Sequence, residues 1–297
     1  MSDMRKNVPC RRSAFHVLHV PPVKILPLIL LILLILSKNF FPMENTLIDG
    51  RYLLLADLGS GGEARVFRAQ DMVTQDEVAV RLALRPGTHT PSDSLPAFHD
   101  GWVRLLAAGS DPHYGAYQVF ELLEGRTLGQ LIRSGPLGPD AWRSFVGQSL
   151  DAVEALHAAG WTHGDLNAGN FFQAASGWKL LELPFLRLDP PADRSALFGS
   201  IHTLAPEQID GAHPDVRSDL YSLGCLYYYA ASGAYPHPGA NSREVAIHCL
   251  RFAPDPLGEK APGLPASWSA WVMPLLAREP RDRFPTVAAA RQLLGVA

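Results

Sequence analysis

The sequence predicts an α+β fold with two lobes, a small lobe rich in strands followed by a larger helical lobe. Residues 51–123 contain short segments in which apolar and polar side chains alternate, as they do in half-buried strands. After Thr127 the apolar side chains recur at intervals of three and four residues, which is typical of helices. The chain has 297 residues, 47% hydrophobic and 19% charged, which is enough for two lobes with buried cores.

The small lobe is expected to contain five strands and no helix of its own. The first two strands flank a glycine-rich turn. Residues 86–100 hold three prolines and show no helical periodicity, so we expect no helix there. The expected strands are 51–59, 64–71, 77–84, 102–109 and 116–123, and the first expected helices are 127–134 and 140–160.

We divide the chain into an extension at 1–42, a small lobe at 43–123 and a large lobe at 124–297. The extension contains the apolar run Ile25–Leu36, whose twelve residues fall short of the roughly 20 that span a membrane. Basic residues precede this run, as in a signal peptide, but no small-residue cleavage site follows it. Our preferred interpretation is that translation starts at Met43 and that the protein is cytoplasmic. The alternative is a membrane anchor formed by residues 25–36.

The charge of the chain is unevenly distributed. Of 26 basic and 29 acidic residues, six basic and one acidic fall within 1–42, so the remainder carries 20 and 28, a net charge of −8. This balance disfavours recognition of nucleic acid. The three cysteines, Cys10, Cys225 and Cys249, show neither metal-ligand spacing nor a disulfide framework, which is typical of a reducing compartment.

Several short motifs follow one another after Met43. LGSGGEARVF (58–67) places Gly59 and Gly61 between two strands, where glycine lets a backbone approach phosphate groups closely. HGDLNAGN (163–170) holds Asp165 and Asn170 on one loop between a long helix and an apolar strand pair. LAPEQI (204–209), DLYSLG (219–224) and EPRDRF (279–284) come later in the chain.

Together these motifs resemble the eukaryotic-type protein Ser/Thr kinase family over nearly all of the chain after Met43. The resemblance implies a bilobal protein-kinase-like fold and phosphotransfer from ATP, with Mg²⁺, to a protein substrate. It implies that Asp165 accepts the hydroxyl proton and that Asn170 and Glu182 bind metal. Gly59 and Gly61 would approach the phosphates, and the backbone of Glu121–Leu123 would bind adenine. The side chains implied for the adenine slot are Leu58, Val66, Ala79, Leu123 and Phe172.

The small lobe departs from the family pattern at its phosphate-binding cation. Arg81 stands where the family has a lysine, and there is no lysine between Met43 and Trp178. Arginine keeps the charge, but its planar fork does not replace a compact ammonium group. Residues 82–100 also lack the usual helix with a glutamate partner, so we expect no ion pair of the family type.

The large lobe departs from the pattern around its catalytic loop. Gly164 replaces an arginine, which argues against control by activation-loop phosphorylation through that position. Asn167 replaces a lysine that steadies the transferring phosphoryl group. Glu182-Leu183-Pro184 stands in place of the family's D-F-G, so the metal-binding carboxylate is one methylene longer. The implied pairing of Glu207 with Arg283 and the anchoring role of Asp219 are retained.

Three functions are consistent with this pattern. The first is a protein-kinase-like domain whose phosphotransfer to protein Ser/Thr is weak or lost, a pseudokinase that binds a partner. The second is an active Ser/Thr protein kinase. The third is a small-molecule phosphotransferase of the aminoglycoside or choline kinase type, which H-G-D-L-x-x-x-N also resembles. The A-P-E and D-x-Y-S-x-G segments count against the third.

Overall fold

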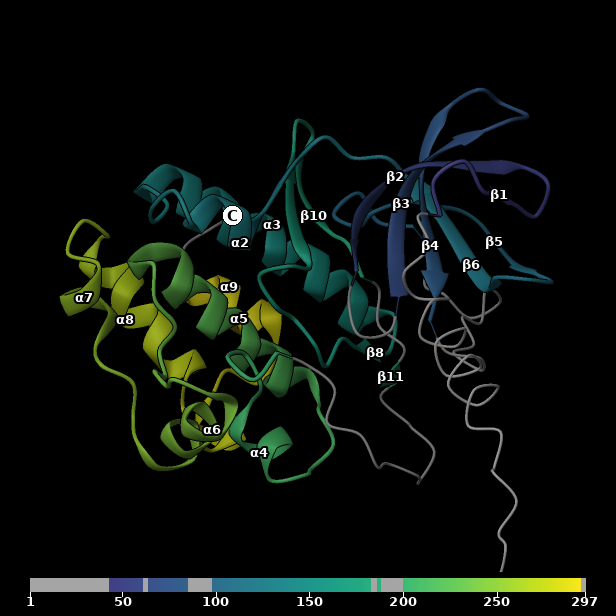
Figure 1. Ribbon diagram of the computed structural model, residues 1–297. Helices are drawn as coiled ribbons and strands as arrows, with labels where there is room; N and C mark the ends of the chain where they lie inside the picture. Colours follow the sequence, from purple (N-terminus) through teal and green to yellow (C-terminus); the bar gives the residue numbers. More distant parts are fainter. Residues whose placement is uncertain (1–42, 61–63, 85–97, 183–185, 188–199, 295–297) are drawn as a thin grey trace, which may run out of the picture. The chain divides into compact units, whose positions relative to one another are not determined.

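The computed structural model describes residues 43–60, 64–84, 98–182, 186–187 and 200–294. By its internal contacts the chain divides into two units, Met1–Met43 and Glu44–Ala297. The second unit has a bilobal α+β fold, with an antiparallel sheet forming one lobe and helices forming the other (Figure 1). Among the described residues no helix is both long enough and apolar enough to cross a membrane.

The small lobe is a six-stranded antiparallel sheet with the strand order β1-β2-β3-β4-β6-β5. In β4, Val78, Val80 and Leu82 are buried while the alternate residues, Arg81 among them, are more exposed. This alternation is the one that the sequence predicted for a sheet with one core-facing side. The strands are β1 Leu47–Ile48, β2 Tyr52–Ser60, β3 Ala64–Asp71, β4 Glu77–Ala83, β5 Leu105–Asp111 and β6 Gly115–Glu121.

Only β3 has the predicted limits at both ends, and the limits of β2 and β4 differ by one residue. β6 ends at Glu121 instead of Leu123, and β5 begins at Leu105 instead of Trp102. Trp102 instead forms a parallel bridge with Leu180 and lies in the core of the helical lobe. Its indole N–H donates to the carbonyl of Ala152 at 2.9 Å, so this segment joins the two lobes.

The helical lobe begins with a capped helix at the position expected. Thr127 and Gln130 form a capping box at the start of α2 (Leu128–Ile132). α3 (Pro139–Ala158) begins with a proline at its first position and buries one apolar stripe. α5 (Val216–Ser232) is capped by Asp215 and ends at Gly233 with a φ of +79°.

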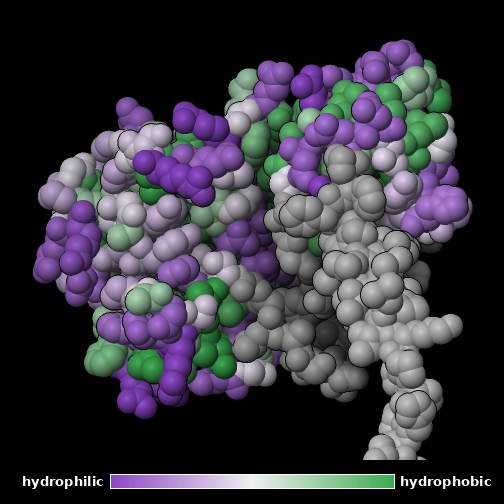
Figure 2. Space-filling model, viewed as in Figure 1, coloured by the Kyte–Doolittle hydropathy of each residue, from purple (hydrophilic) through white to green (hydrophobic). Residues whose placement is uncertain are grey.

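The remaining elements surround α3 and α5. Three short strand pairings, β7–β9, β9–β10 and β8–β11, flank the loop at 163–170. On the face shown in Figure 2 the helical lobe is mostly hydrophilic or neutral, because its large apolar side chains are buried between the helices. These elements are β7 Gly125–Thr127, β8 Trp161–Thr162, β9 Phe171–Ala174, β10 Gly177–Leu180, β11 Leu186–Arg187, α4 Pro206–Ile209, α6 Ser242–Arg251, α7 Leu257–Lys260, α8 Ala266–Leu275, the 3₁₀ helix η2 Pro280–Asp282 and α9 Val287–Leu294.

Some predictions lie outside the described residues. They concern the extension 1–42 with its apolar run 25–36, Gly61 in the glycine-rich turn, the expected lack of a helix within 86–97, and Leu183-Pro184. Cys225 and Cys249 are described, and both are free and buried.

Candidate active site

The loop at 163–170 is anchored by a buried carboxylate from the first turn of α5. Asp219 has no exposed surface and accepts hydrogen bonds from the backbone N–H groups of His163 and Gly164, both at 2.8 Å. The Nε2 atom of His157 on α3 lies 2.8 Å from the same carboxylate. Because the carboxylate holds two successive N–H groups, it fixes the backbone of the loop. The anchoring role expected for Asp219 is confirmed.

Gly164 has a conformation that favours glycine. Its φ is +76°, in the left-handed region where a Cβ atom is strained. Its carbonyl accepts a hydrogen bond of 2.9 Å from the side chain of Gln208 on α4, and Gln208 in turn accepts one from the N–H of Ala205. The glycine at this position therefore suits a turn that joins the loop to the segment 205–209.

His163 connects the loop to Glu182. Its Nε2 atom lies 2.6 Å from the carbonyl oxygen of Glu182, and its Nδ1 atom lies 3.2 Å from the backbone nitrogen of Asp165. A carbonyl only accepts and a backbone N–H only donates, so the ring is the neutral tautomer with hydrogen on Nε2. The N–H of Leu181 also donates to the carbonyl of Asn170 at 2.8 Å. These bonds bring Asp165, Asn170 and the backbone of Glu182 together.

Asp165 presents one oxygen of its carboxylate that is unused within the described part of the chain. The Oδ1 atom accepts hydrogen bonds from Asn167 Nδ2 at 3.1 Å and from the N–H of Ser200 at 3.2 Å. The Oδ2 atom accepts none from the described residues. Asn167 therefore contacts the carboxylate that the family resemblance identifies as the proton acceptor.

Asn170 and Glu182 are suited to hold a magnesium ion. The Asn170 amide nitrogen donates to the carbonyl of Asp165 at 2.9 Å, and its Oδ1 atom accepts no hydrogen bond from the described residues. The side chain of Glu182 is exposed. Mg²⁺ prefers oxygen ligands and usually takes only one or two from protein, with the others from water and phosphate. The described part of the chain has no cluster of three or more His, Cys, Asp or Glu residues that could form a closed metal site.

On the small lobe, the predicted phosphate-binding and adenine-binding residues share neighbouring strands. Val66 on β3 pairs with Gly59 on one side and with Arg81 on the other. Ala79 lies two residues before Arg81 and faces the same side of β4. Leu58 is an exposed apolar side chain, with 53% of its surface accessible. Gly59 has a φ of +152°, which few other residues adopt.

The segment after β6 offers backbone groups for adenine. The N–H of Glu121 is already bonded to the carbonyl of Arg104, whose own N–H donates to the Glu121 carboxylate at 2.9 Å. No described residue forms a hydrogen bond with the N–H of Leu123, so that donor is open to a ligand. Phe172, the remaining predicted side chain, lies half-buried in β9 opposite Thr127 of β7.

Arg81 has a partner that sequence reasoning missed. Its Nη1 atom donates to Gln118 Oε1 at 3.3 Å, and Gln118 lies directly opposite on β6. Gln208, which bonds Gly164, was also missed. Neither glutamine was singled out by a motif role. For Gln118 the available signal was a long polar side chain between apolar neighbours, and for Gln208 it was its place within LAPEQI.

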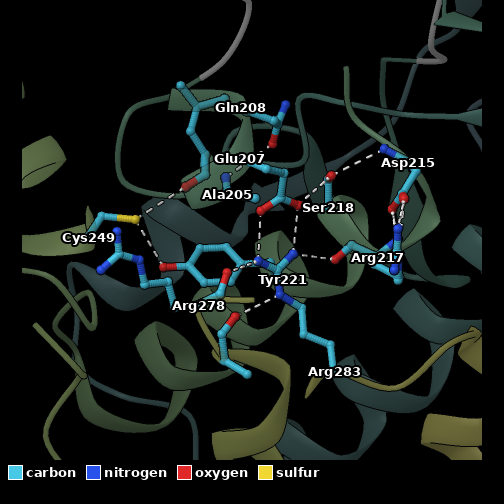
Figure 3. Close-up of polar contacts among 12 residues, drawn as sticks. Ala205, Glu207, Gln208, Asp215, Arg217, Ser218, Tyr221, Cys249, Arg278 and Arg283 are labelled. Atoms are coloured by element: carbon cyan, nitrogen blue, oxygen red, sulfur yellow. Dashed lines mark hydrogen bonds and ion pairs between the residues drawn. The ribbon is translucent and has the colours of Figure 1, made fainter. Parts of the chain in front are cut away.

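A buried ion pair holds the segment that contains α4 (Figure 3). Arg283 forms two bonds of 2.7 Å to the carboxylate of Glu207, and its other N–H groups donate to the carbonyls of Ala277, Arg217 and Arg278. All five guanidinium donors are therefore used. The expected pairing of Glu207 with Arg283 is confirmed. Arg283 also stacks on the ring of Tyr221, where burial raises the pKa of the hydroxyl and keeps it neutral.

The strand-rich lobe, the helical lobe and the H-x-D-x-x-x-x-N loop are together typical of one class of proteins, the phosphotransferases of the kinase type. Residues 52–292 match the family model described as protein kinase domain, so the chain belongs to this family, within its eukaryotic-type Ser/Thr group.

Curated proteins similar to this chain include Ser/Thr protein kinases of bacteria. The chain is 30% identical to serine/threonine-protein kinase pkn2 of Myxococcus xanthus, over 74% of this chain and 29% of the relative. It is 29% identical to PknL of Mycobacterium tuberculosis, over 82% and 64% respectively. It is 33% identical to the DNA damage-responsive kinase RqkA of Deinococcus radiodurans, over 83% and 39%. The chain therefore spans less than two thirds of the length of each of these relatives.

Proposed function

We propose that this protein binds ATP with Mg²⁺ and transfers the γ-phosphoryl group to Ser or Thr of a protein at a rate well below that of an ordinary kinase. In this reaction the acceptor oxygen forms a bond to the γ-phosphorus while the bond from that phosphorus to the β,γ-bridging oxygen breaks. The hydroxyl proton passes to Asp165, and ADP leaves. Bound Mg²⁺ would neutralise the developing charge on the phosphates.

One observation carries the proposal. The loop at 163–170 is anchored by Asp219, and it carries an Asp165 carboxylate oxygen and an Asn170 amide oxygen that accept no hydrogen bond from the described residues. The cation expected to bind phosphate is instead an arginine with a neutral partner. The loop supports retention of the chemistry, and Arg81, Asn167 and Glu182 support a loss of rate. Removing one positioned group typically lowers the rate by about 10²–10³.

A rate estimate follows from these losses. Two independent losses would lower an ordinary kinase turnover of about 1–100 s⁻¹ to roughly 10⁻² s⁻¹ or less. Losses of groups that act together are less than additive, so this estimate is an upper bound on the damage.

The test is transfer of labelled phosphate from ATP to casein and to the protein itself, with Mg²⁺ or Mn²⁺, beside an Asp165→Ala variant. We expect slow transfer to Ser and Thr that the substitution abolishes. Transfer that persists in Asp165→Ala would contradict the proposed role of the loop.

The second candidate is a binding module without chemistry, supported by the replacement of Arg81 and of the D-F-G segment. A thermal-shift titration with ATP and Mg²⁺ separates the two, because a ligand that binds the folded state raises the melting temperature. A raised melting temperature without phosphoryl transfer would favour a nucleotide-binding pseudokinase. An unchanged melting temperature without phosphoryl transfer would favour a domain that only binds a partner.

A further inference from the structure

Arg81 and Gln118 form a cross-strand pair on the face of the small-lobe sheet opposite Val80 and Leu82. The two residues are in direct register between β4 and β6, and the guanidinium donates to the amide oxygen at 3.3 Å. Arg81 forms no ion pair with any acidic residue in the described part of the chain. Among the described residues, Gln118 is therefore the hydrogen-bond partner of this cation.

Gln118 occupies a position that an apolar residue would fill if packing alone mattered. Only 6% of its surface is exposed, and its strand neighbours Tyr117 and Val119 are buried. Burying an amide is unfavourable unless it is hydrogen-bonded. Among the described residues, its side chain is hydrogen-bonded to Arg81 alone. The polar side chain is thus explained by its arginine partner.

The pair lies two strands away from Gly59. Val66 is opposite Gly59 on one side and Arg81 on the other, so Gly59 and Arg81 are separated by two strand spacings, roughly 10 Å. A nucleotide whose phosphates lie against the backbone of Gly59 would place them within reach of a long guanidinium side chain.

We propose that Gln118 is a positioning residue that aims Arg81 at the phosphates of the bound nucleotide, in the place of a carboxylate partner. A neutral amide orients the guanidinium without neutralising it, so the full positive charge remains for the anionic ligand. The alignment then depends on the register of β4 and β6 and not on a separate helix. This inference rests on the proposed function, because it requires that the protein bind ATP.

The experiment measures the affinity of the full chain for ATP with Mg²⁺ and for adenosine, which has no phosphates, by calorimetry. The variants are Gln118→Met, which keeps the volume and loses the acceptor, and Gln118→Glu, which keeps an acceptor. Gln70→Met, in β3 of the same sheet, is the matched control. We expect Gln118→Met to weaken ATP binding about threefold to tenfold, the range for one lost hydrogen bond. Adenosine binding should change less than about twofold in every variant. Gln70→Met should bind ATP nearly as wild type does, whereas Gln118→Glu, whose carboxylate neutralises the guanidinium, should weaken ATP binding and leave adenosine binding nearly unchanged.

An additional cycle tests the pairing itself. In an Arg81→Met background, Gln118→Met should cause no further loss of ATP affinity, because the group that it positions is gone. Unchanged ATP affinity in Gln118→Met would overturn the inference, and so would an equal loss of ATP and adenosine affinity, which would indicate a structural role in the sheet. If Gln118→Met does not fold, an ATP affinity of Gln118→Glu equal to that of wild type overturns it as well. Wild-type protein that binds adenosine but not ATP would instead refute the proposed function itself.

Discussion

At the scale of a single residue, Arg283 shows how one side chain can hold several segments of the helical lobe together. Its guanidinium is buried and serves four different acceptor residues, Glu207 among them. Lysine offers a single ammonium group and cannot serve these acceptors in their fixed positions.

We therefore expect Arg283→Lys to lower the free energy of unfolding by about 3 kcal/mol, since breaking a buried pair costs about 3–5 kcal/mol and lysine keeps the charge. Urea unfolding followed by tryptophan fluorescence measures this loss. Arg217→Lys is the control, because Arg217 pairs with Asp215 at the surface, where an ion pair contributes little. Equal losses of free energy of unfolding in Arg283→Lys and Arg217→Lys would contradict the stabilising role of the buried pair of Arg283 with Glu207.

Asp71 gives a pH-dependent prediction at the same scale. Its hydrogen bonds with the Arg51 guanidinium lower the pKa of the carboxyl to about 2. A carboxyl whose pKa is lower in the folded state stabilises that state above its unfolded pKa of roughly 3.9, and this stabilisation is lost as the pH falls toward 2. The advantage of wild type over Asp71→Asn in free energy of unfolding should therefore shrink between pH 5 and pH 3. An advantage that stays constant over this range would exclude the lowered pKa.

At the scale of elements, α5 determines the shape of the catalytic loop through one side chain in its first turn. Asp219 holds the N–H groups of His163 and Gly164, and Gln208 on α4 holds the carbonyl of Gly164. The loop is thus fixed from two helices by hydrogen bonds that need no phosphorylated residue.

Replacing Asp219 by asparagine puts an amide donor beside groups that can only donate. We expect Asp219→Asn to lower the free energy of unfolding by about 2–3 kcal/mol, the range for hydrogen bonds to a charged group. Hydrogen exchange at 163–170 should accelerate, whereas Asp210→Asn, at an exposed helix end, should leave it unchanged. Unchanged exchange in Asp219→Asn would show that other contacts hold the loop.

The sequence predicted those parts of the site that depend on local spacing. Asp165 and Asn170 lie five residues apart on one loop, and the strands of the small lobe followed from alternation. The contacts of Arg81 with Gln118 and of Gly164 with Gln208 join residues 37 and 44 positions apart. Strand register and helix packing determine which polar side chains meet at such distances, so spacing in the sequence did not predict them. Trp102 was assigned to a strand because its neighbours alternate, but its large indole packs into the other lobe.

At the scale of the whole molecule, Trp102 joins the segment before β5 to the core of the helical lobe within Glu44–Ala297. It belongs to the core of the helical lobe although it precedes β5, and Val103 and Gly101 exchange backbone hydrogen bonds with Leu180. We expect Trp102→Ala to cost about 3–5 kcal/mol, as is usual for a buried large aromatic residue.

We expect the loss of Trp102 to affect the two lobes differently. In Trp102→Ala, hydrogen exchange in β2–β6 should accelerate more than in α3 and α5, because the sheet loses this attachment while the helices keep the many other side chains of their core. Phe98 precedes Trp102 in the sequence and is exposed, so Phe98→Ala should have little effect on hydrogen exchange in either lobe. Equal acceleration in both lobes would place the coupling elsewhere.

The central claim is that the substrate side of this kinase domain is built normally while its nucleotide side is altered. The most direct test is the single-turnover rate of phosphoryl transfer at saturating ATP and Mg²⁺, using the best acceptor from a library of Ser/Thr peptides. We predict a rate well below about 1 s⁻¹, which reaches roughly 10⁻² s⁻¹ or less where the losses are independent. A rate of about 1 s⁻¹ or more, within the ordinary range for protein kinases, would contradict the account.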